Sequence, residues 1–269
     1  MRLVSFDPLR TLGIPGVHAV KPENWFREKA AVQAADWLLF PEYWQVNALY
    51  YVLKKRIFPS IGTYHLGHDK VEMHRAFEAA FPGNTPVTRI LPRTPVSVEQ
   101  ILDEFSFPFV AKEIRSAMGM GVFLVNDRAE FLRYAARNEV LFAQEYLPIF
   151  RDLRIVIVGK TAAAGYWREA QEGCFHNNVA KGGKISFRRV PPEAVRLAEN
   201  VAAELTIDHA GFDVAEVDGR YFLLEFNPRF GTRALNAAGI RIAELIFGYL
   251  CEVSQSPIQP ETPKLPKAS

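Results

Sequence analysis

Two apolar segments flank Asp218-Gly219 near the C-terminal end of the chain, and this combination is a strong short-range signal for a β-hairpin. Three polar side chains interrupt the apolar segments: Asp213 before the turn, and Glu225 and Asn227 after it. A buried carboxylate is costly unless it is paired or binds a cation, and oxygen ligands of this kind suit Mg²⁺. The hairpin therefore predicts a metal site formed by Asp213, Glu225 and Asn227. The alternative is an edge hairpin with solvated carboxylates.

The length of the turn decides whether the three polar side chains share one face. A two-residue turn at Asp218-Gly219 pairs Val217 with Arg220 and sends Asp213 and Glu225 to opposite faces, because side chains alternate along a strand. A three-residue turn that includes Arg220 sets Asp213 directly opposite Glu225, with the amide further along the same face. We therefore predict the three-residue turn.

Composition narrows the class of protein. The chain has 269 residues, which suits one large domain or two small ones, and 49% of them are hydrophobic. A formal net charge of +2 argues against a dedicated nucleic-acid binder. Two cysteines, Cys174 and Cys251, cannot form a disulfide framework. The N-terminus reads as a strand rather than a signal peptide, and no apolar run approaches the roughly 20 residues that span a bilayer. We expect a cytoplasmic protein without a membrane or nucleic-acid partner.

The first part of the chain alternates between short apolar strands and helical patterns. Strands are predicted over 2–6, 36–40 and 56–59, with helices over about 22–35 and 43–55. This order predicts a small parallel sheet. Residues 62–69 contain two His and two Gly and are predicted to be a linker, and Lys70 begins a helix that runs to about Ala80. Near the other end, residues 234–250 are predicted to form one helix.

A lysine and a glycine-rich loop lie in the middle of the chain. Lys112 lies in an apolar strand, and Gly119 and Gly121 follow it in a loop before the next strand. Backbone N–H groups of such a loop can close over phosphate oxygens, and a lysine supplies a compact positive charge. The pattern is not a Walker motif, because no Gly-Lys-Ser/Thr opens a helix. The alternative is a hairpin with a solvent-reaching lysine.

Two further segments have a functional and a neutral interpretation. The strand over 140–148 ends in Gln144-Glu145-Tyr146-Leu147, where exposed backbone groups beside apolar walls can bind an adenine edge; a plain strand end is the alternative. Residues 151–189 are rich in Arg and Lys. They form either a surface that faces a polyphosphate or a solvated face.

In their order along the chain, these elements resemble the ATP-grasp superfamily and, within it, the RimK-like amino-acid ligases. The resemblance covers about residues 65–250 and rests on seven motifs that are weak alone but specific as an ordered set. The matching elements are Lys70; Lys112 with Gly119 and Gly121; Gln144-Glu145-Tyr146-Leu147; Asp152-Leu153-Arg154; Arg168; Asn177-Asn178-Val179-Ala180-Lys181-Gly182-Gly183; and Gly211-Phe212-Asp213 with Glu225-Phe226-Asn227.

The resemblance implies an α/β (α+β) chain with the ATP-grasp fold, in which the nucleotide is held between two α+β subdomains. A short parallel α/β domain over 1–64 would precede the ATP-grasp domain over 65–253. That domain would divide into a small lid subdomain at about 85–146 and a metal-bearing subdomain at about 147–253. The Pro-rich tail, residues 254–269, is expected to be disordered.

The resemblance also implies a role for each matching position. Lys70 and Lys112 would bind the phosphates of ATP, and the Gly119–Gly121 loop would close over them. The segment from Gln144 to Leu147 would hold adenine, chiefly through Glu145 and Tyr146, and Asp152 would lie beside the ribose. Arg168 and Asn178 would face the γ-phosphate and the acyl-phosphate. Asn177 would belong to the nucleotide-binding residues. Asp213, Glu225 and Asn227 would hold two Mg²⁺, with Mn²⁺ as an alternative ion.

The activity implied is an ADP-forming ligase that joins a carboxylate to an amine through an acyl-phosphate, with a small molecule, an amino acid or a peptide as substrates. Phosphoryl transfer needs positioning and charge neutralisation more than a protein nucleophile, which agrees with the residues present. A kinase on the same fold and a non-catalytic nucleotide-binding module are the alternatives.

Two departures from the family pattern lead to further expectations. Asn227 is followed by Pro228-Arg229-Phe230-Gly231, so Arg229 and Arg233 are predicted to bind an anionic substrate group. The N-terminal domain is short for the family, so a partner could complete the substrate wall. A homodimer would supply one, and the sequence leaves the oligomeric state open.

Overall fold

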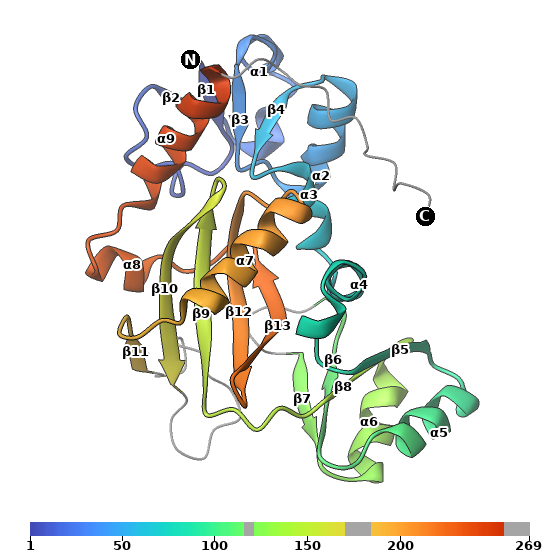
Figure 1. The fold of residues 1–269 in the computed structure, drawn as a ribbon. Helices are drawn as coiled ribbons and strands as arrows, with labels where there is room; N and C mark the ends of the chain where they lie inside the picture. Colours follow the sequence, from blue (N-terminus) through green and yellow to red (C-terminus); the bar gives the residue numbers. More distant parts are fainter. Residues whose placement is uncertain (116–120, 170–183, 256–269) are drawn as a thin grey trace, which may run out of the picture.

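The computed structural model describes residues 1–115, 121–169 and 184–255, and these contain three β-sheets with helices packed on them (Figure 1). The first sheet is parallel with the strand order β2-β1-β3-β4. Its strands are β1 (Leu3–Ser5), β2 (Val17–Ala19), β3 (Trp37–Leu39) and β4 (Arg56–Phe58). The parallel sheet is confirmed. Strand β2 is additional, and its mostly exposed residues carry no apolar run that would reveal it.

The helices of this first layer are short. A 3₁₀ turn (Pro22–Asn24) and α1 (Lys29–Ala34) replace the predicted helix over 22–35. Helix α2 (Tyr43–Asn47) continues into a π-helical turn (Ala48–Val52).

Residues 62–69 are not a linker, because α3 (Ile61–Leu66) occupies most of this segment. The Ser60 side chain caps α3 by accepting a hydrogen bond from the Thr63 amide at 3.1 Å. Gly62 allows close packing, since a Cβ atom there would lie 2.7 Å from the Leu205 carbonyl oxygen. Asp208 also accepts a hydrogen bond from the Ser60 amide at 2.7 Å. The first sheet and its helices, called the first layer below, are therefore attached to the rest of the molecule through the contacts of α3 with Leu205 and Asp208.

The second sheet is antiparallel with the order β5-β8-β6-β7. It follows α4 (Lys70–Ala80), whose predicted bounds are confirmed, and a 3₁₀ turn (Pro82–Asn84). Its elements are β5 (Thr88–Pro92), α5 (Pro95–Glu104), β6 (Phe109–Lys112), β7 (Val122–Val125), α6 (Arg128–Arg137) and β8 (Val140–Glu145). Phe109 and Ala111 pack in the core under α5 and α6. Because strand side chains alternate, Lys112 lies on the face away from these helices.

The third sheet is the largest and is also antiparallel, with the order β11-β10-β9-β12-β13. Its strands are β9 (Arg151–Val158), β10 (Thr161–Glu169), β11 (Lys184–Ser186), β12 (His209–Val217) and β13 (Arg220–Asn227). Helix α7 (Pro192–Glu204) and α4 cover one face through a core that includes Phe77, Phe212 and Phe226. The opposite face carries the polar side chains described below.

The predicted helix over 234–250 is wrong as a single element. It is split into α8 (Arg233–Ala237) and α9 (Ile242–Gln255), because Gly239 adopts a positive φ of 76° that a continuous helix does not allow. Leu39 and Phe58 of the first sheet share one core with Val156 of β9 and Ile246 of α9. Figure 1 shows α9 beside the first sheet, so the two layers form one packed body.

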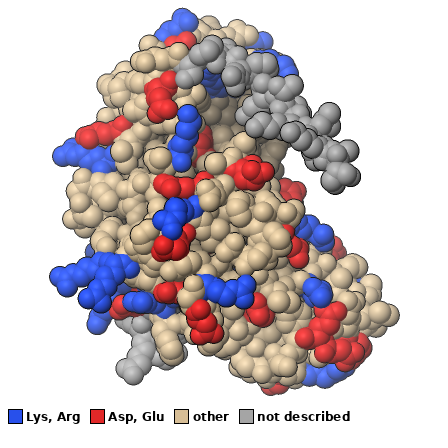
Figure 2. Space-filling view, viewed as in Figure 1, with Lys and Arg blue, Asp and Glu red and all other residues tan. Residues whose placement is uncertain are grey.

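Charges on the surface are mixed. In Figure 2, acidic and basic side chains are interspersed over most of the visible face, with basic groups gathered beside β11, where Lys184, Arg188 and Arg189 are exposed. Among the described residues, none of the helices combines the length and apolar character that crossing a membrane requires.

Candidate functional site

The turn of the hairpin has two residues, so the predicted three-residue turn is wrong. Val217 pairs with Arg220, and Asp218 and Gly219 have positive φ angles of 49° and 73°. Positive φ at both turn residues matches the right-handed twist of the flanking strands, and Asp-Gly favours this geometry.

Asp213 nevertheless lies directly opposite Glu225. The register runs from Val214 opposite Leu223 to Asp213 opposite Glu225, so Leu224 is an extra residue that forms a β-bulge. The neighbouring pair, Phe212 and Phe226, faces the helix-covered core, so the two carboxylates face the other way.

The amide of Asn227 completes this group. Asn227 Nδ2 donates to Glu225 Oε1 at 3.1 Å, as expected for residues two apart on one strand face. The structure therefore brings the three predicted metal ligands to one face of the third sheet. Within the described residues, no group of three or more His, Cys, Asp or Glu side chains is placed to hold a metal ion, so the candidate ligands are two carboxylates and one amide.

A buried ion-pair network lies beside these ligands. Arg154 Nη2 donates to Asp213 Oδ2 at 3.1 Å. Arg168 binds Asp152 in a bidentate manner at 2.7 and 2.6 Å, and its Nη2 lies 3.0 Å from Asp213 Oδ1. All four side chains are buried. Two guanidiniums and two carboxylates thus neutralise one another across β9, β10 and β12.

The sequence creates this network by placing charged residues at alternate positions of strands that are otherwise apolar. Asp152 and Arg154 are two apart on β9, and Asp213 is the cross-strand neighbour of Arg154 on β12. Gly211 leaves room for the arginine, because a Cβ atom there would lie 2.7 Å from Arg154 Nη1. Burial raises the pKa of Asp152 above its usual range, and the Arg168 guanidinium limits that rise.

Lysines from two other elements face the carboxylates. Lys112 is buried at the end of β6, with its Nζ 5.5 Å from the centre of the Phe142 ring. Burial lowers the pKa of Lys112 to about 8; the charges of Glu225 and Asp213 oppose this shift, and that of Lys70 adds to it. The Lys70 amide donates to the Ile114 carbonyl at 3.3 Å, which ties the start of α4 to the end of β6. Lys112 therefore acts on the face that carries Asp213 and Glu225, and the start of α4 brings Lys70 close enough to act on Lys112.

The donor set fits magnesium bound together with a polyphosphate. Asp213, Glu225 and Asn227 offer carboxylate and amide oxygens, which are the ligands that Mg²⁺ prefers. Asp213 Oδ1 already lies 2.5 Å from Arg154 Nε and 3.0 Å from Arg168 Nη2. The network with Lys112 and Glu225 holds three positive and three negative groups. A bare divalent ion would leave uncompensated charge in this buried site, whereas an ion bound to phosphates adds little net charge.

The segment predicted to hold adenine, from Gln144 to Leu147, begins at the end of β8 and leads toward β9. Gln144 Nε2 donates to Thr88 Oγ1 at 2.9 Å, and Glu145 Oε1 accepts from the Val87 amide at 2.8 Å. These two side chains stabilise the pairing of β5 with β8 in the second sheet. Tyr146 is exposed and Leu147 half-buried in the connection to β9.

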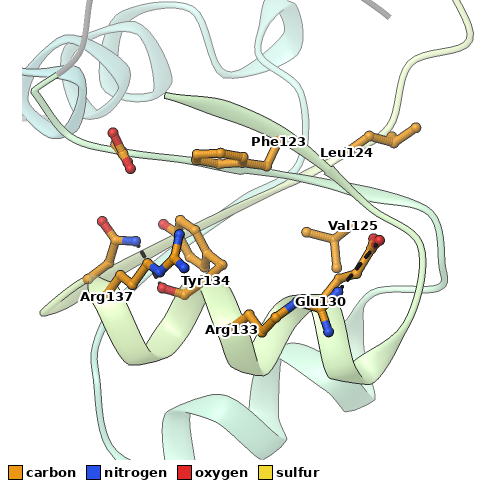
Figure 3. A pocket seen from close by; sticks show the side chains of 9 residues that line it. Phe123, Leu124, Val125, Glu130, Arg133, Tyr134 and Arg137 are labelled. Atoms are coloured by element: carbon orange, nitrogen blue, oxygen red, sulfur yellow. Dashed lines mark hydrogen bonds and ion pairs between the residues drawn. The ribbon is translucent and has the colours of Figure 1, made fainter. Parts of the chain in front are cut away.

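A cavity of about 270 Å³ beside the second sheet is not part of this site. It is lined by β7 and α6, with Phe123, Tyr134 and Arg137 among its walls (Figure 3). These side chains lie on the helix-covered side of the second sheet, whereas Lys112 lies on the other side.

Other predicted residues lie elsewhere. Gly119, Asn177 and Asn178 are outside the described residues. The Gly121 carbonyl accepts from the Glu113 amide at 2.7 Å at the base of the predicted glycine loop. Asp152, predicted for the ribose side, faces Arg168 instead of a free surface. Arg229 pairs with Glu42 of the first layer at 3.0 Å, and Arg233 begins α8.

The sequence reasoning gave no role to Arg154, although it lies in one of the matching motifs. Its alternation with Asp152 in an apolar strand was a usable signal. The contact of Glu42 with Arg229 spans 187 positions, and no local pattern indicates it.

Comparison with known proteins agrees with this architecture. Residues 68–250 match the model of the RimK-like ATP-grasp domain. The ribosomal protein bS6–L-glutamate ligase of Escherichia coli O7:K1 is 31% identical over 166 residues, which are 59% of this chain and 55% of that protein. The chain thus spans about half the length of the curated relatives it matches.

Solved structures show the same fold at low identity. A RimK domain ATP-grasp protein of Sphaerobacter thermophilus superposes with a TM-score of 0.67 at 16% identity, covering 93% of this chain and 99% of that one. The D-alanine–D-alanine ligase of Bacillus anthracis gives a TM-score of 0.70 at 17% identity, covering 94% and 97%. The predicted fold class and family are confirmed: the chain has the ATP-grasp fold and belongs to the RimK-like ATP-grasp family.

Proposed function

We propose that this protein is an ATP- and Mg²⁺-dependent ligase that joins a carboxylate to an amine and releases ADP and phosphate. The observation that supports this most is the convergence of Asp213, Glu225 and Asn227 with Lys112 from the lid. The two sides of a Mg-ATP site come from two different sheets. Residues 1–64, 65–253 and 254–269 remain our proposed division into N-terminal domain, ATP-grasp domain and tail.

In this proposal, Lys70 and Lys112 bind the phosphates and Arg168 faces the transferred phosphoryl group. Asn178 and the Gly119–Gly121 loop complete this side, and the segment from Gln144 to Leu147 borders the adenine. Mg²⁺, as two ions or replaced by Mn²⁺, would be held by Asp213, Glu225 and Asn227 and would neutralise developing charge on the phosphates.

The proposed chemistry has two steps. An oxygen of the substrate carboxylate attacks the γ-phosphorus, and the bond to the ADP oxygen breaks, which gives an acyl-phosphate. The amine then attacks the acyl carbon, phosphate leaves with the bonding electron pair, and the amine loses a proton. The buried guanidiniums of Arg154 and Arg168 hold the Asp213 carboxylate in place for this site.

The names of the relatives suggest the substrate class. They are ligases of ribosomal protein bS6 and L-glutamate. We propose an amino acid as one substrate of this chain and a small-molecule or peptide carboxylate as the other. ATP as a substrate fits a cytoplasmic location.

The test is to incubate the protein with ATP, Mg²⁺, hydroxylamine and a panel of carboxylates, and to measure ADP and acyl-hydroxamate. A ligase gives both, in equal amounts, and the Glu225→Gln variant gives about 100-fold less of each. ADP with a stable phosphorylated product and no hydroxamate would indicate the kinase alternative. Binding of Mg-ATP by calorimetry without ADP release from any carboxylate would indicate a binding module.

A further inference from the structure

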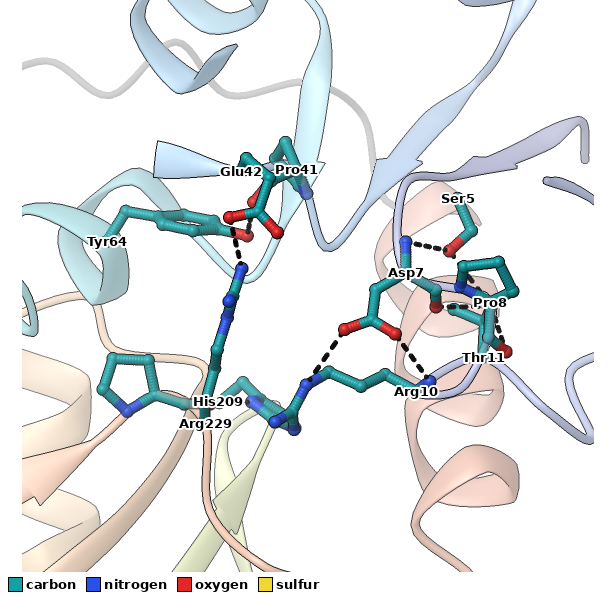
Figure 4. A network of polar contacts seen from close by, with 11 residues as sticks. Ser5, Asp7, Pro8, Arg10, Thr11, Pro41, Glu42, Tyr64, His209 and Arg229 are labelled. Atoms are coloured by element: carbon teal, nitrogen blue, oxygen red, sulfur yellow. Dashed lines mark hydrogen bonds and ion pairs between the residues drawn. The ribbon is translucent and has the colours of Figure 1, made fainter. Parts of the chain in front are cut away.

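A second polar network lies where the first layer meets the third sheet, and the site described above does not use it (Figure 4). It is formed by Asp7 and Arg10 after β1, Glu42 and Tyr64 of the first layer, and Arg229 after β13. All but Arg229 lie before residue 68, where the match to the family domain begins. The network is therefore a feature of this chain's own N-terminal layer.

Arg229 is held firmly at the edge of the candidate metal site. It follows Asn227 by two positions, and both of its neighbours are anchored by the buried His209. The imidazole Nδ1 lies 3.0 Å from the Pro228 carbonyl oxygen, and the ring stacks on Phe230 with centroids 4.8 Å apart. The Arg229 side chain remains 47% exposed.

Arg10 approaches Arg229 from the first layer. Its Nε lies 3.3 Å from Asp7 Oδ2, and its amide donates to Asp7 Oδ1 at 3.2 Å. Figure 4 shows the Arg10 guanidinium pointing toward Arg229. Burial and the charge of Arg229 lower the pKa of Arg10, while Asp7 opposes this shift. Two like charges therefore act on one another at this junction, and each is paired with a single carboxylate, Arg10 with Asp7 and Arg229 with Glu42.

This arrangement is not explained by folding stability alone. The side chains of both ion pairs are between 25% and 47% exposed, and ion pairs at such sites contribute little to stability. Repulsion between the two guanidiniums opposes folding, and an anion bound near both would offset it. Guanidiniums bind carboxylates with good geometry.

We propose that Arg10 and Arg229 together bind the carboxylate of the α-amino acid that supplies the amine. Asp7 and Glu42 hold the two guanidiniums in place. This inference rests on the proposed ligase function and names the residues that select its amine substrate. Because Arg10 belongs to the N-terminal layer, that layer contributes directly to specificity.

The test compares two amines that differ in whether they carry a carboxylate. The acceptors are an equimolar mixture of the twenty common L-amino acids and, separately, hydroxylamine, each with ATP, Mg²⁺ and the carboxylate that gives most hydroxamate with the unmodified protein. We measure amide or hydroxamate product for Arg10→Ala and for Glu42→Arg combined with Arg229→Glu. The double variant keeps an ion pair between the two layers, so the fold is preserved even if Arg10→Ala unfolds. Arg196→Ala, which breaks the exposed pair with Glu193, is the matched control.

We expect both variants to lose at least tenfold in product from the amino acids and to keep hydroxamate formation within twofold, with the control unchanged. An equal loss with hydroxylamine would overturn the inference, because the two arginines would then act on ATP, the carboxylate or the fold. Hydroxamate formation without any amide from the amino-acid mixture in the unmodified protein would overturn it as well. Absence of hydroxamate with every carboxylate would instead contradict the proposed function itself.

Discussion

Asp213 lies directly opposite Glu225 only because the bulge at Leu224 corrects the register set by a two-residue turn. Without the bulge, the two carboxylates would point to opposite faces of the third sheet. With it, the charges of both carboxylates act on Lys112 of β6. The bulge therefore places both carboxylates on the face of the third sheet that carries the candidate site.

Glu225→Gln should remove the negative charge of a half-buried candidate metal ligand and leave the protein folded. We expect ADP release to fall by about 100-fold, as when one group that stabilises a developing charge is removed. The amide can still accept from Asn227, so thermal unfolding should change little. Glu216→Gln in the same hairpin is the control, because Glu216 pairs with Tyr221 near the turn. Equal activity of the two variants would refute a metal role for Glu225.

Gly211→Ala should disturb the ion-pair network through packing. The new methyl group would meet Arg154 at 2.7 Å from Nη1 and 2.9 Å from Cδ, so the guanidinium must move away from Asp213. Overpacking of this kind costs about 1–3 kcal/mol, and chemical denaturation would measure it. Gly248→Ala in α9 meets no neighbour within 4 Å and should stabilise the protein by up to about 1 kcal/mol.

Lys112→Met should separate stability from nucleotide binding. The buried ammonium is costly in the free protein, as its lowered pKa shows, and methionine fills a similar volume. The variant should unfold at the same or a higher temperature without ligand. It should lose the shift that Mg-ATP gives the unmodified protein, which is about 2.7 kcal/mol at 100 times Kd. A full ligand-induced shift in the variant would show that Lys112 does not bind phosphate.

Local patterns predicted those parts of the fold whose periodicity is strong. The helix from Lys70 to Ala80 and the strands β1, β3 and β4 of the first sheet follow from the spacing of apolar residues within each short segment. The segment at 62–69 was misread because Gly62 and Gly67 suggest flexibility. In the structure both allow close packing, since a Cβ atom on Gly67 would collide with Pro228.

For the candidate site as well, local sequence patterns predict some residues and not others. Acidic residues in apolar strands stand out in the sequence, so Asp213 and Glu225 were found. Their shared face was predicted for the wrong reason, because the apolar residue Leu224 fits a bulge and a regular strand equally well. Arg10 and Glu42 were missed because their contacts join segments far apart in the chain.

The last prediction concerns Asp208, which joins α3 to β12. Its Oδ1 accepts from the Ser60 amide at 2.7 Å and from Thr63 Oγ1 at 3.3 Å. Burial raises the pKa of Asp208 to about 7, although these hydrogen bonds oppose the shift. In the unfolded chain the pKa is near its ordinary value of about 3.9.

Between about pH 4 and pH 7 the folded protein therefore keeps a proton that the unfolded chain has lost, so this group's contribution to stability falls as the pH rises. Asp208→Asn keeps the acceptor oxygen but cannot ionise. We expect the variant to gain on the order of 3 kcal/mol relative to the unmodified protein between pH 4 and pH 7. Urea unfolding at several pH values measures this difference. A constant difference across the range would show that Asp208 is ionised in the folded protein, and Asp218→Asn in the exposed turn should show no such trend.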